Sequence, residues 1–215
     1  MTVSNVGDWI SVSFKKIQKK NLSISVIYIV NLTKREIETE VLEFKDNVVS
    51  ISWDKQNGRF GVVYELPSAV KNDDVKFGVS FYQIQIKDKV QQAIKVGEIA
   101  ETPANRIILA QNGAFFALYN ISVLSAGKYK YTLGVFTKDQ KSKKLSIEII
   151  KQDIEIPYMT YFDMDESGRF ILTGTNKTYQ IWTTAGELIS KDMFSVEIHN
   201  VSFRPRFINK LAPAL

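Results

Sequence analysis

The sequence predicts an all-β protein made of β-propeller blades, each a sheet of four antiparallel strands. Four glycines carry this prediction, because an aromatic residue follows each of them two positions later: Gly7, Gly58, Gly113 and Gly168. Successive glycines lie 51, 55 and 55 residues apart. A fixed period of this size marks an array of like supersecondary units. Four strand candidates per period are typical of propeller blades of the WD-repeat or kelch kind.

Each period is expected to open with a hairpin whose turn contains the glycine. Around Gly58, the β-rich run Val48–Trp53 precedes the turn and the run Arg59–Tyr64 follows it. Asn-Gly supplies the positive φ angles that tight hairpin turns need. The corresponding runs are 106–110 and 115–119 around Gly113, and 159–162 and 170–173 around Gly168.

Two more strands are predicted after each hairpin. They cover residues 79–84 and 92–96, then 129–136 and 145–150, then 178–182 and 187–190, the last pair joined by an Ala185-Gly186 turn. The best helix candidate, Val90 to Ile99, is interrupted by Gly97, so a strand is the better prediction there.

The expected blade units are 1–46, 47–104, 105–156 and 157–198, with a closing strand at 199–206. The first unit is expected to lack its opening strand and to start at Trp9, whereas His199–Phe203 resembles an opening strand with no blade after it. The prediction is therefore three full blades plus a split fourth. Either the two ends pair and close a four-bladed ring, or the chain is part of a larger propeller, since an open arc leaves exposed edges.

Composition narrows the class of protein. The 215 residues are 45% hydrophobic and 24% charged, with no cysteine and a net charge of +5. No apolar run approaches the roughly 18 residues of a membrane span, and the first residues show no signal-peptide pattern. We expect a soluble cytoplasmic protein without disulfides, and its mildly basic charge permits contact with a polyanion.

No motif in the sequence assembles an active site. His199 is the single histidine, and phosphate-binding loops and nucleophile elbows are missing. Residues 163–168 match the first six positions of an EF-hand calcium loop, but position 12 is Gly174 and the flanks are predicted strands. The segment is better explained as a polar hairpin turn. We therefore expect no enzyme activity, metal, cofactor or small-molecule substrate.

Two basic runs are the candidate binding residues. Both are predicted to lie in loops between strands, where lysines either serve solubility or contact phosphates in a salt-sensitive, sequence-independent way. The candidate contacts to ribosome or RNA are Lys15, Lys16, Lys19 and Lys20 in the first run, and Lys138, Lys141, Lys143 and Lys144 in the second.

Several motifs resemble the β-propeller of the B subunit of eukaryotic translation initiation factor 3. The family's blade turn, Trp-(Asp/Glu)-Pro-x-Gly-(Arg/Asp)-(Phe/Tyr), is similar to residues 53–60 and 163–170, and its Val-Ser-Phe-Tyr strand to residues 79–82. A Tyr-x-Ile-Trp strand at 179–182 and a Gly-x-Leu hairpin at 186–188 match it further on. Its closing motif, Trp-Arg-Pro-Arg-Pro, resembles Phe203, Arg204, Pro205, Arg206 and Phe207. Two residues of this closing motif differ, and no turn keeps the proline.

The resemblance implies a nine-bladed propeller, of which this chain would be the last third to half. It also implies a non-catalytic scaffold that docks on the small ribosomal subunit, through rRNA and ribosomal proteins, with other components of factor 3 (a, g and i) as further partners. The family's RNA-recognition domain and C-terminal helical extension are expected to be absent.

Three functions therefore compete. The first is the translation-initiation scaffold, with the four glycines as structural turn residues. The second is a generic protein-interaction propeller, including one like that of initiation factor 2A. The third is a propeller enzyme, which the lack of clustered His, Asp and Glu disfavours.

Overall fold

In a computed structural model, the described residues of the chain form sixteen strands, arranged in four separate sheets of four antiparallel strands each. The structure describes residues 2–6, 9–17, 23–31, 39–54, 57–67, 75–87, 90–120, 128–142, 144–157, 159, 161–197 and 202–203. Within these residues there is no helix. The all-β prediction is confirmed.

The four sheets follow one another along the chain, and within each sheet the strands pair in sequence order. The first sheet contains β1 (Thr2–Val6), β2 (Trp9–Ile17), β3 (Ser23–Asn31) and β4 (Thr39–Phe44). The second contains β5 (Val48–Trp53), β6 (Arg59–Glu65), β7 (Phe77–Lys87) and β8 (Val90–Thr102). The third contains β9 (Arg106–Leu109), β10 (Phe115–Tyr119), β11 (Lys128–Lys138) and β12 (Leu145–Pro157). The fourth contains β13 (Tyr161–Met164), β14 (Phe170–Gly174), β15 (Thr178–Thr183) and β16 (Leu188–Met193).

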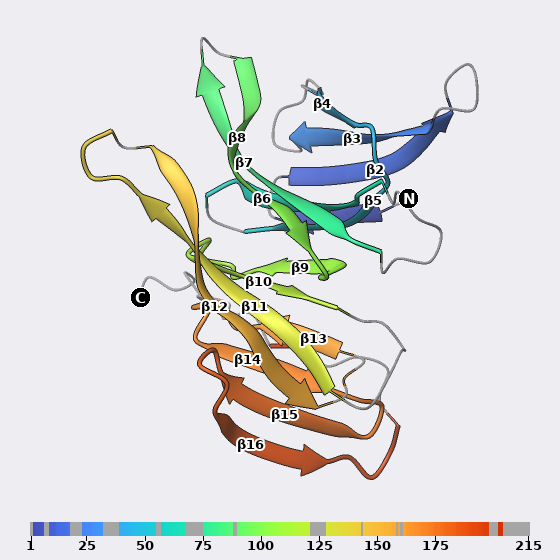
Figure 1. The fold of residues 1–215 in the computed structure, drawn as a ribbon, viewed down its shortest axis with the longest axis vertical. Helices are drawn as coiled ribbons and strands as arrows, with labels where there is room; N and C mark the ends of the chain where they lie inside the picture. Colours follow the sequence, from blue (N-terminus) through green and yellow to red (C-terminus); the bar gives the residue numbers. More distant parts are fainter. Residues whose placement is uncertain are drawn as a thin grey trace, which may run out of the picture.

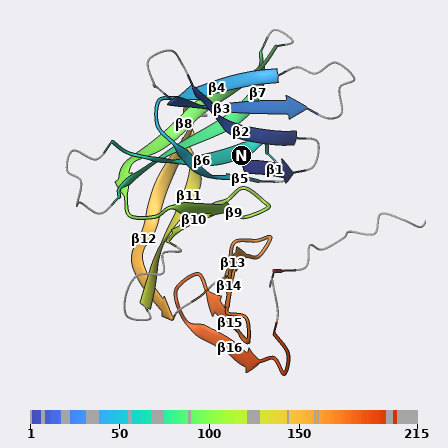
Figure 2. The same ribbon diagram turned by 90° about the vertical axis from the view of Figure 1, so that its right-hand side faces the viewer.

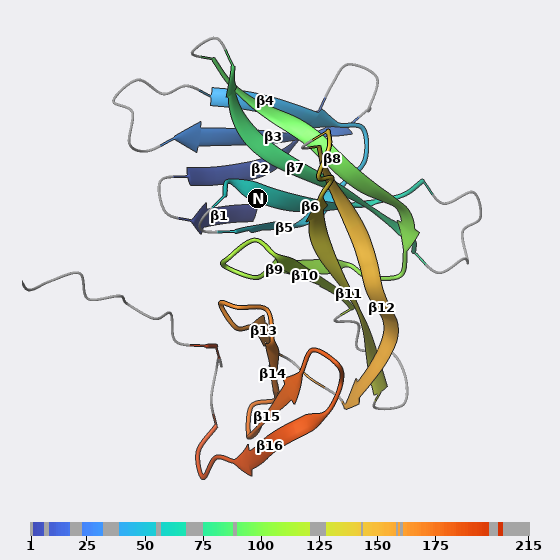
Figure 3. The same ribbon diagram turned by 90° about the vertical axis from the view of Figure 1, so that its left-hand side faces the viewer.

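The sheets are stacked face to face in chain order, with the first sheet at one end of the row and the fourth at the other (Figure 1). Both side views keep this order (Figures 2 and 3). Neighbouring sheets contact each other chiefly through their first strands, β1 with β5, β5 with β9 and β9 with β13. Contact through first strands is how blades surround the axis of a propeller.

The first sheet corrects the prediction of a split blade. Its opening strand β1 pairs with β2 along its whole length, from Thr2 opposite Ser13 to Val6 opposite Trp9. Only two apolar residues occur in the five of β1, so pairing with β2, rather than local hydrophobic pattern, defines it as a strand. All four blades are complete, and no strand from residues 199–206 is needed in the first sheet.

The third and fourth strands of the middle sheets are longer than predicted. β8 and β12 each have 13 residues, whereas the innermost β9 has four. Register shifts lie within both long pairs, at Phe81/Tyr82 in one and at Tyr131/Leu133 in the other. Such bulges increase strand twist and allow a long ribbon to continue. The β7–β8 and β11–β12 hairpins therefore project beyond the body of the stack (Figure 1).

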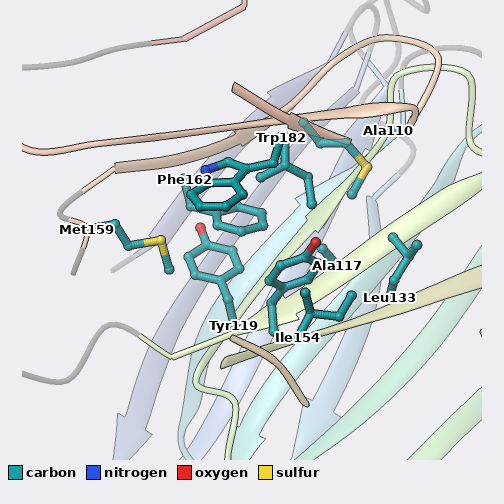
Figure 4. Packing of buried hydrophobic residues seen from close by; sticks show 11 residues of the cluster. Ala110, Ala117, Tyr119, Leu133, Ile154, Met159, Phe162 and Trp182 are labelled. Carbon is teal, nitrogen blue, oxygen red and sulfur yellow. The ribbon is translucent and has the colours of Figure 1, made fainter. Parts of the chain in front are cut away.

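Each pair of neighbouring sheets encloses its own hydrophobic cluster. Sheets one and two bury Ile27, Trp53 and Phe60, and sheets two and three bury Phe81 and Phe116. The cluster between sheets three and four includes Ala110, Ala117, Tyr119, Tyr131, Leu133, Ile154, Met159, Phe162, Met164, Ile171 and Trp182 (Figure 4). Since each middle sheet is apolar on both faces, it depends on both of its neighbours for burial.

Candidate interaction surface

The second basic run forms the tip of the projecting β11–β12 hairpin. Lys138 is the last residue of β11, and Lys144 lies just before β12. The side chains of Lys138, Lys141 and Lys144 are exposed, and Lys143 lies outside the described residues. A projecting hairpin with exposed lysines can reach a partner without rearrangement of the sheets.

Hydrogen bonds to Asp139 fix the shape of this tip. Its Oδ1 accepts the backbone N–H of Ser142 at 2.6 Å and that of Lys141 at 3.0 Å, and its own N–H donates to the carbonyl of Lys144 at 3.0 Å. The bonds from Ser142 and Lys141 hold the pKa of Asp139 below its usual value. Asp139 thus stays ionised and orders the turn, while three lysines around it leave the tip net positive.

The first basic run lies at the opposite ends of the sheets. Lys15 and Lys16 are not in a loop but belong to β2, opposite Ser25 and Ile24 of β3; Lys19 and Lys20 lie outside the described residues. In an antiparallel sheet of four strands, the second-to-third connection lies at the other end from the third-to-fourth connection. The β2–β3 end and the β11–β12 tip accordingly point in opposite directions (Figure 1). The described lysines of the two runs therefore do not form one patch.

Three of the four repeated glycines lie in described turns between the first and second strands of their sheets. Gly58, Gly113 and Gly168 have φ angles of 64°, 66° and 71°, which favour glycine because other residues are strained there. Gly7 lies outside the described residues. A Cβ on Gly113 would come within 1.9 Å of Asp54 Oδ2 in the neighbouring turn. Gly113 is therefore required by close contact between sheets as well as by the turn itself.

Side chains in these turns join the second sheet to the third and the third sheet to the fourth. Asn57 Nδ2 donates to the carbonyl of Asn112 at 2.8 Å, and Asn112 Nδ2 donates to the carbonyl of Ser167 at 3.2 Å. Arg59 Nη1 donates to the carbonyl of Gly113 at 2.6 Å, and its guanidinium lies 5.2 Å from the ring centre of Phe136. Burial lowers the pKa of Arg59, although the charge of Asp54 opposes this shift. These turn residues are structural contacts between sheets.

The EF-hand-like segment is a hairpin turn in which the Asp165 carboxylate is already occupied. Oδ1 accepts the backbone N–H groups of Arg169 and Phe170, both at 2.7 Å, and Oδ2 accepts that of Ser167 at 3.0 Å. Burial alone would raise the pKa of Asp165, but these bonds together with the Ser167 hydroxyl lower it. Among the residues with described positions, no three His, Cys, Asp or Glu gather in a way that could hold a metal ion.

The predicted closing motif is described only at its first residue. Phe203 N–H donates to Asp163 Oδ2 on the first strand of the fourth sheet at 2.7 Å. Arg204, Pro205 and Arg206 lie outside the described residues, as does His199. Of the two architectures left open by the sequence, pairing of the two ends has no place in the first sheet, because β1 already supplies its first strand.

Sequence reasoning missed the residues that set the spacing between sheets. Ser50 and Ser52 accept the backbone N–H groups of Ile107 and Leu109, and Asn57 and Arg59 act as described above. One signal was present in the sequence, because Asn-Gly occurs twice, 55 residues apart. The sequence of a single repeat, however, does not show that the side chains of its turn contact the turn of the following repeat. No helix among the described residues is long and apolar enough to cross a bilayer.

The repeated four-stranded sheets, in contact through their first strands, define the class of this protein as a β-propeller-type repeat protein. The family model described as "Eukaryotic translation initiation factor eIF2A" matches residues 9–201. The chain therefore belongs to the eIF2A family.

Curated relatives confirm the resemblance to the B subunit of factor 3 at low identity. The chain is similar to the B subunit of eukaryotic translation initiation factor 3 from Schizosaccharomyces pombe, with 22% identity over 93% of this chain and 29% of that protein. It is 27% identical to the same protein of Cryptococcus neoformans, over 87% of this chain and 27% of that protein. The chain thus spans less than a third of the length of these relatives.

A solved structure supports the fold. The crystal structure described as that of a eukaryotic initiation factor superimposes with a TM-score of 0.50 and 13% identity, covering 92% of this chain and 56% of the other.

Proposed function

We propose that this chain is a non-catalytic scaffold segment of the factor 3 complex and docks on the small ribosomal subunit in the cytoplasm. Relatives named as the B subunit of factor 3 support the translation-initiation role. Other components of factor 3 and the small ribosomal subunit are the proposed partners.

The preorganised lysine tip of the β11–β12 hairpin is the observation that carries the docking proposal. Its exposed Lys138, Lys141 and Lys144 stand on a turn already ordered by Asp139. An ordered turn loses little conformational entropy on binding, and lysines neutralise phosphates without reading sequence. The geometry suits the phosphate backbone of ribosomal RNA.

Co-sedimentation with purified small ribosomal subunits across a salt series tests this proposal. We expect binding at low salt that weakens as salt rises, because counterions compete for the phosphates. The triple variant of Lys138, Lys141 and Lys144 to Ala should reduce the slope of log affinity against log salt by about 2 to 3, close to one unit per lost contact.

A control variant removes the same number of positive charges at positions away from the β11–β12 tip. Lys45 just after β4, Lys177 between β14 and β15, and Lys191 on β16 are exposed, and their triple change to Ala should leave most of the binding intact. Equal losses in the two variants would mean that net charge, not the tip, controls binding. Absence of co-sedimentation at low salt would contradict ribosome docking itself.

A protein partner outside translation is the second candidate. Leu188, Ile189 and Met193 on the outer strand β16 are 50%, 53% and 69% exposed, and exposed apolar side chains on one element favour protein contact. Affinity capture with the intact chain as bait, followed by mass spectrometry, separates the two candidates. Ribosomal proteins and components of factor 3 should dominate the recovered proteins, and their absence beside a reproducible other partner would favour this second function.

A further inference from the structure

The tip of the β11–β12 hairpin carries one hydroxyl group among its lysines. Residues 138–144 read Lys-Asp-Gln-Lys-Ser-Lys-Lys, so Ser142 is the only serine or threonine of the run. The Ser142 side chain is exposed, and its Oγ accepts the backbone N–H of Lys144 at 3.3 Å. The hydroxyl group is therefore presented at the outer end of a hairpin that projects beyond the stack (Figure 1).

The same serine helps to hold the shape of the tip. The Asp139 carboxylate accepts the backbone N–H of Ser142 at 2.6 Å and also hydrogen-bonds to its hydroxyl, and both bonds lower the pKa of Asp139. An ionised carboxylate only accepts hydrogen bonds, so the hydroxyl donates to it. A phosphoryl group on Oγ would remove this donor and place a second anion beside the carboxylate. Like charges repel, so the modified serine would loosen the turn.

Two neighbouring hydroxyl groups lie in a different environment. Thr137 Oγ1 and Ser146 Oγ are hydrogen-bonded at 2.9 Å, and the two residues face each other in the β11–β12 ladder. A protein kinase must bring the substrate hydroxyl in line with the γ-phosphate of ATP and against its own catalytic Asp. At Thr137 or Ser146 this requires separation of the paired strands. Ser142 lies beyond the last pair of the ladder, Lys138 with Leu145, so it can be reached while the ladder stays intact.

The charge of the tip suits both recognition of this serine and control by it. Four lysines minus one aspartate give residues 138–144 a formal charge of +3. Lysines on both sides of a serine are complementary to an acidic substrate-binding groove, and charge patterns of this kind select kinase substrates. A phosphoserine carries a charge of about −1.5 to −2 at neutral pH, so modification would leave the tip with only about +1.

We propose that Ser142 is a phosphorylation site for a serine/threonine kinase that selects basic substrates, and that its phosphorylation switches off polyanion binding by the tip. This inference rests on the proposed docking function, because it concerns the regulation of the same lysines. In the reaction, Ser142 Oγ attacks the γ-phosphorus of ATP, the bond between that phosphorus and ADP breaks, and the hydroxyl proton passes to the catalytic base of the kinase. The modification acts twice, since it lowers the charge of the tip and opens the turn that holds the lysines.

Treatment of the full chain with a purified kinase tests the site itself. The probe is protein kinase C, a kinase that prefers basic substrates, with ATP and Mg²⁺, and tandem mass spectrometry measures the occupancy of each hydroxyl. We expect Ser142 to be phosphorylated and Ser146, which is held in the strand ladder, to stay unmodified. An unmodified Ser142, or equal occupancy of Ser142 and Ser146, would overturn the assignment. This readout does not involve the ribosome.

Binding of a fluorescent single-stranded RNA, followed by anisotropy across a salt series, tests the switch. Kinase treatment should weaken binding and reduce the slope of log affinity against log salt by about 1.4, because the phosphoserine neutralises about two lysines. Ser142→Ala treated in the same way is the control and should bind like the untreated wild type. Equal weakening in both proteins, or no weakening in the wild type, would overturn the switch. RNA binding that phosphorylation weakens, beside no co-sedimentation with small ribosomal subunits, would support the switch and contradict only the ribosome docking.

Amide hydrogen exchange tests the opening of the turn. The Lys141 amide, which donates to Asp139 Oδ1, should exchange about tenfold faster after phosphorylation of Ser142, as expected for one lost hydrogen bond. The Gly113 amide, which donates to the carbonyl of Ala110 in a turn of another hairpin, is the control and should keep its rate. An unchanged Lys141 rate would overturn the opening of the turn.

Discussion

Two neighbouring interfaces of the stack, between sheets two and three and between sheets three and four, are aligned by different chemistry. Between the second and third sheets, Ser52 and Arg59 make hydrogen bonds across the gap. Between the third and fourth, Ile108 stands at the position of Ser52 and has no acceptor. There Tyr119 stacks on Phe162 with ring centres 4.2 Å apart (Figure 4). Both interfaces contain aromatic rings and a turn hydrogen bond, but serine side chains hold the next first strand only between sheets two and three.

Burial explains why the interface between sheets three and four tolerates two tyrosines. Tyr119 and Tyr131 are buried in this cluster, and burial raises the pKa of each to about 12. Both phenols therefore stay neutral at physiological pH and behave as apolar rings with a polar tip. The comparison teaches that the side chains that align neighbouring sheets can change from one repeat to the next while the repeat length of 55 residues stays the same.

The largest effect is expected from removing the aromatic stack. Phe162→Ala should lower the free energy of unfolding by about 4 kcal/mol, because a buried aromatic ring is lost and a cavity remains. Chemical denaturation of the intact chain measures it. Phe170→Ala on the outward face of the same sheet is the control and should cost much less, and equal losses would contradict the assigned role of the stack.

The next effect tests the close approach between sheets two and three. Gly113→Ala should cost about 3 kcal/mol, since it adds a clash with Asp54 to the strain of a positive φ. Gly58→Ala has the same backbone strain, but its Cβ would meet Ile84 at an ordinary 3.5 Å, so it should cost about 1 to 2 kcal/mol. Thermal unfolding of both variants checks this order, and a larger loss for Gly58→Ala would contradict it.

Removal of the arginine contact should have a moderate effect. Arg59→Ala loses the bond to the Gly113 carbonyl and the contact with Phe136, together about 2 kcal/mol. Arg169→Ala in the fourth sheet should change the free energy of unfolding by no more than about 0.5 kcal/mol, as expected for an ordinary surface substitution. Chemical denaturation of both variants measures the two losses in the free energy of unfolding. Equal losses would contradict the different roles of the two arginines.

The smallest effect concerns pH. The pKa of Asp165 in the folded chain lies below its unfolded value of about 3.9. Its stabilisation is therefore complete above that value and is lost as pH falls through the lower, folded pKa. Asp165→Asn should flatten the stability profile between about pH 5 and pH 2. Thermal unfolding across this range checks it, and an unchanged profile would contradict the role of this carboxylate.

The sequence was sufficient for the repeat and for most strands. Local turn chemistry at Gly58 and Gly113 is written in adjacent residues, so the hairpins could be predicted. β1 could not, because Thr2–Val6 becomes a strand through pairing with β2 rather than through its own pattern. The ribosome-facing lysines and the partners implied by the resemblance stay predictions.

The contacts between sheets were beyond local reasoning for a further reason. Arg59 and Arg169 stand in the same Gly-Arg-Phe motif, yet one bonds the next turn and the other bonds Ser167 of its own turn. The difference depends on the following sheet, which lies some 55 residues away. Spatial neighbours at that separation are set by the stack and not by the motif.

The turn hydrogen bonds have a direction that bears on how the chain is made. Asn57, Arg59 and Asn112 all donate to carbonyls that come later in the sequence. A nascent chain therefore presents each donor before its acceptor has been synthesised, and domains fold from their N-terminal side as they emerge. During synthesis, the turns at Gly58 and Gly113 therefore each present side-chain donors whose acceptors lie in the turn that is made next.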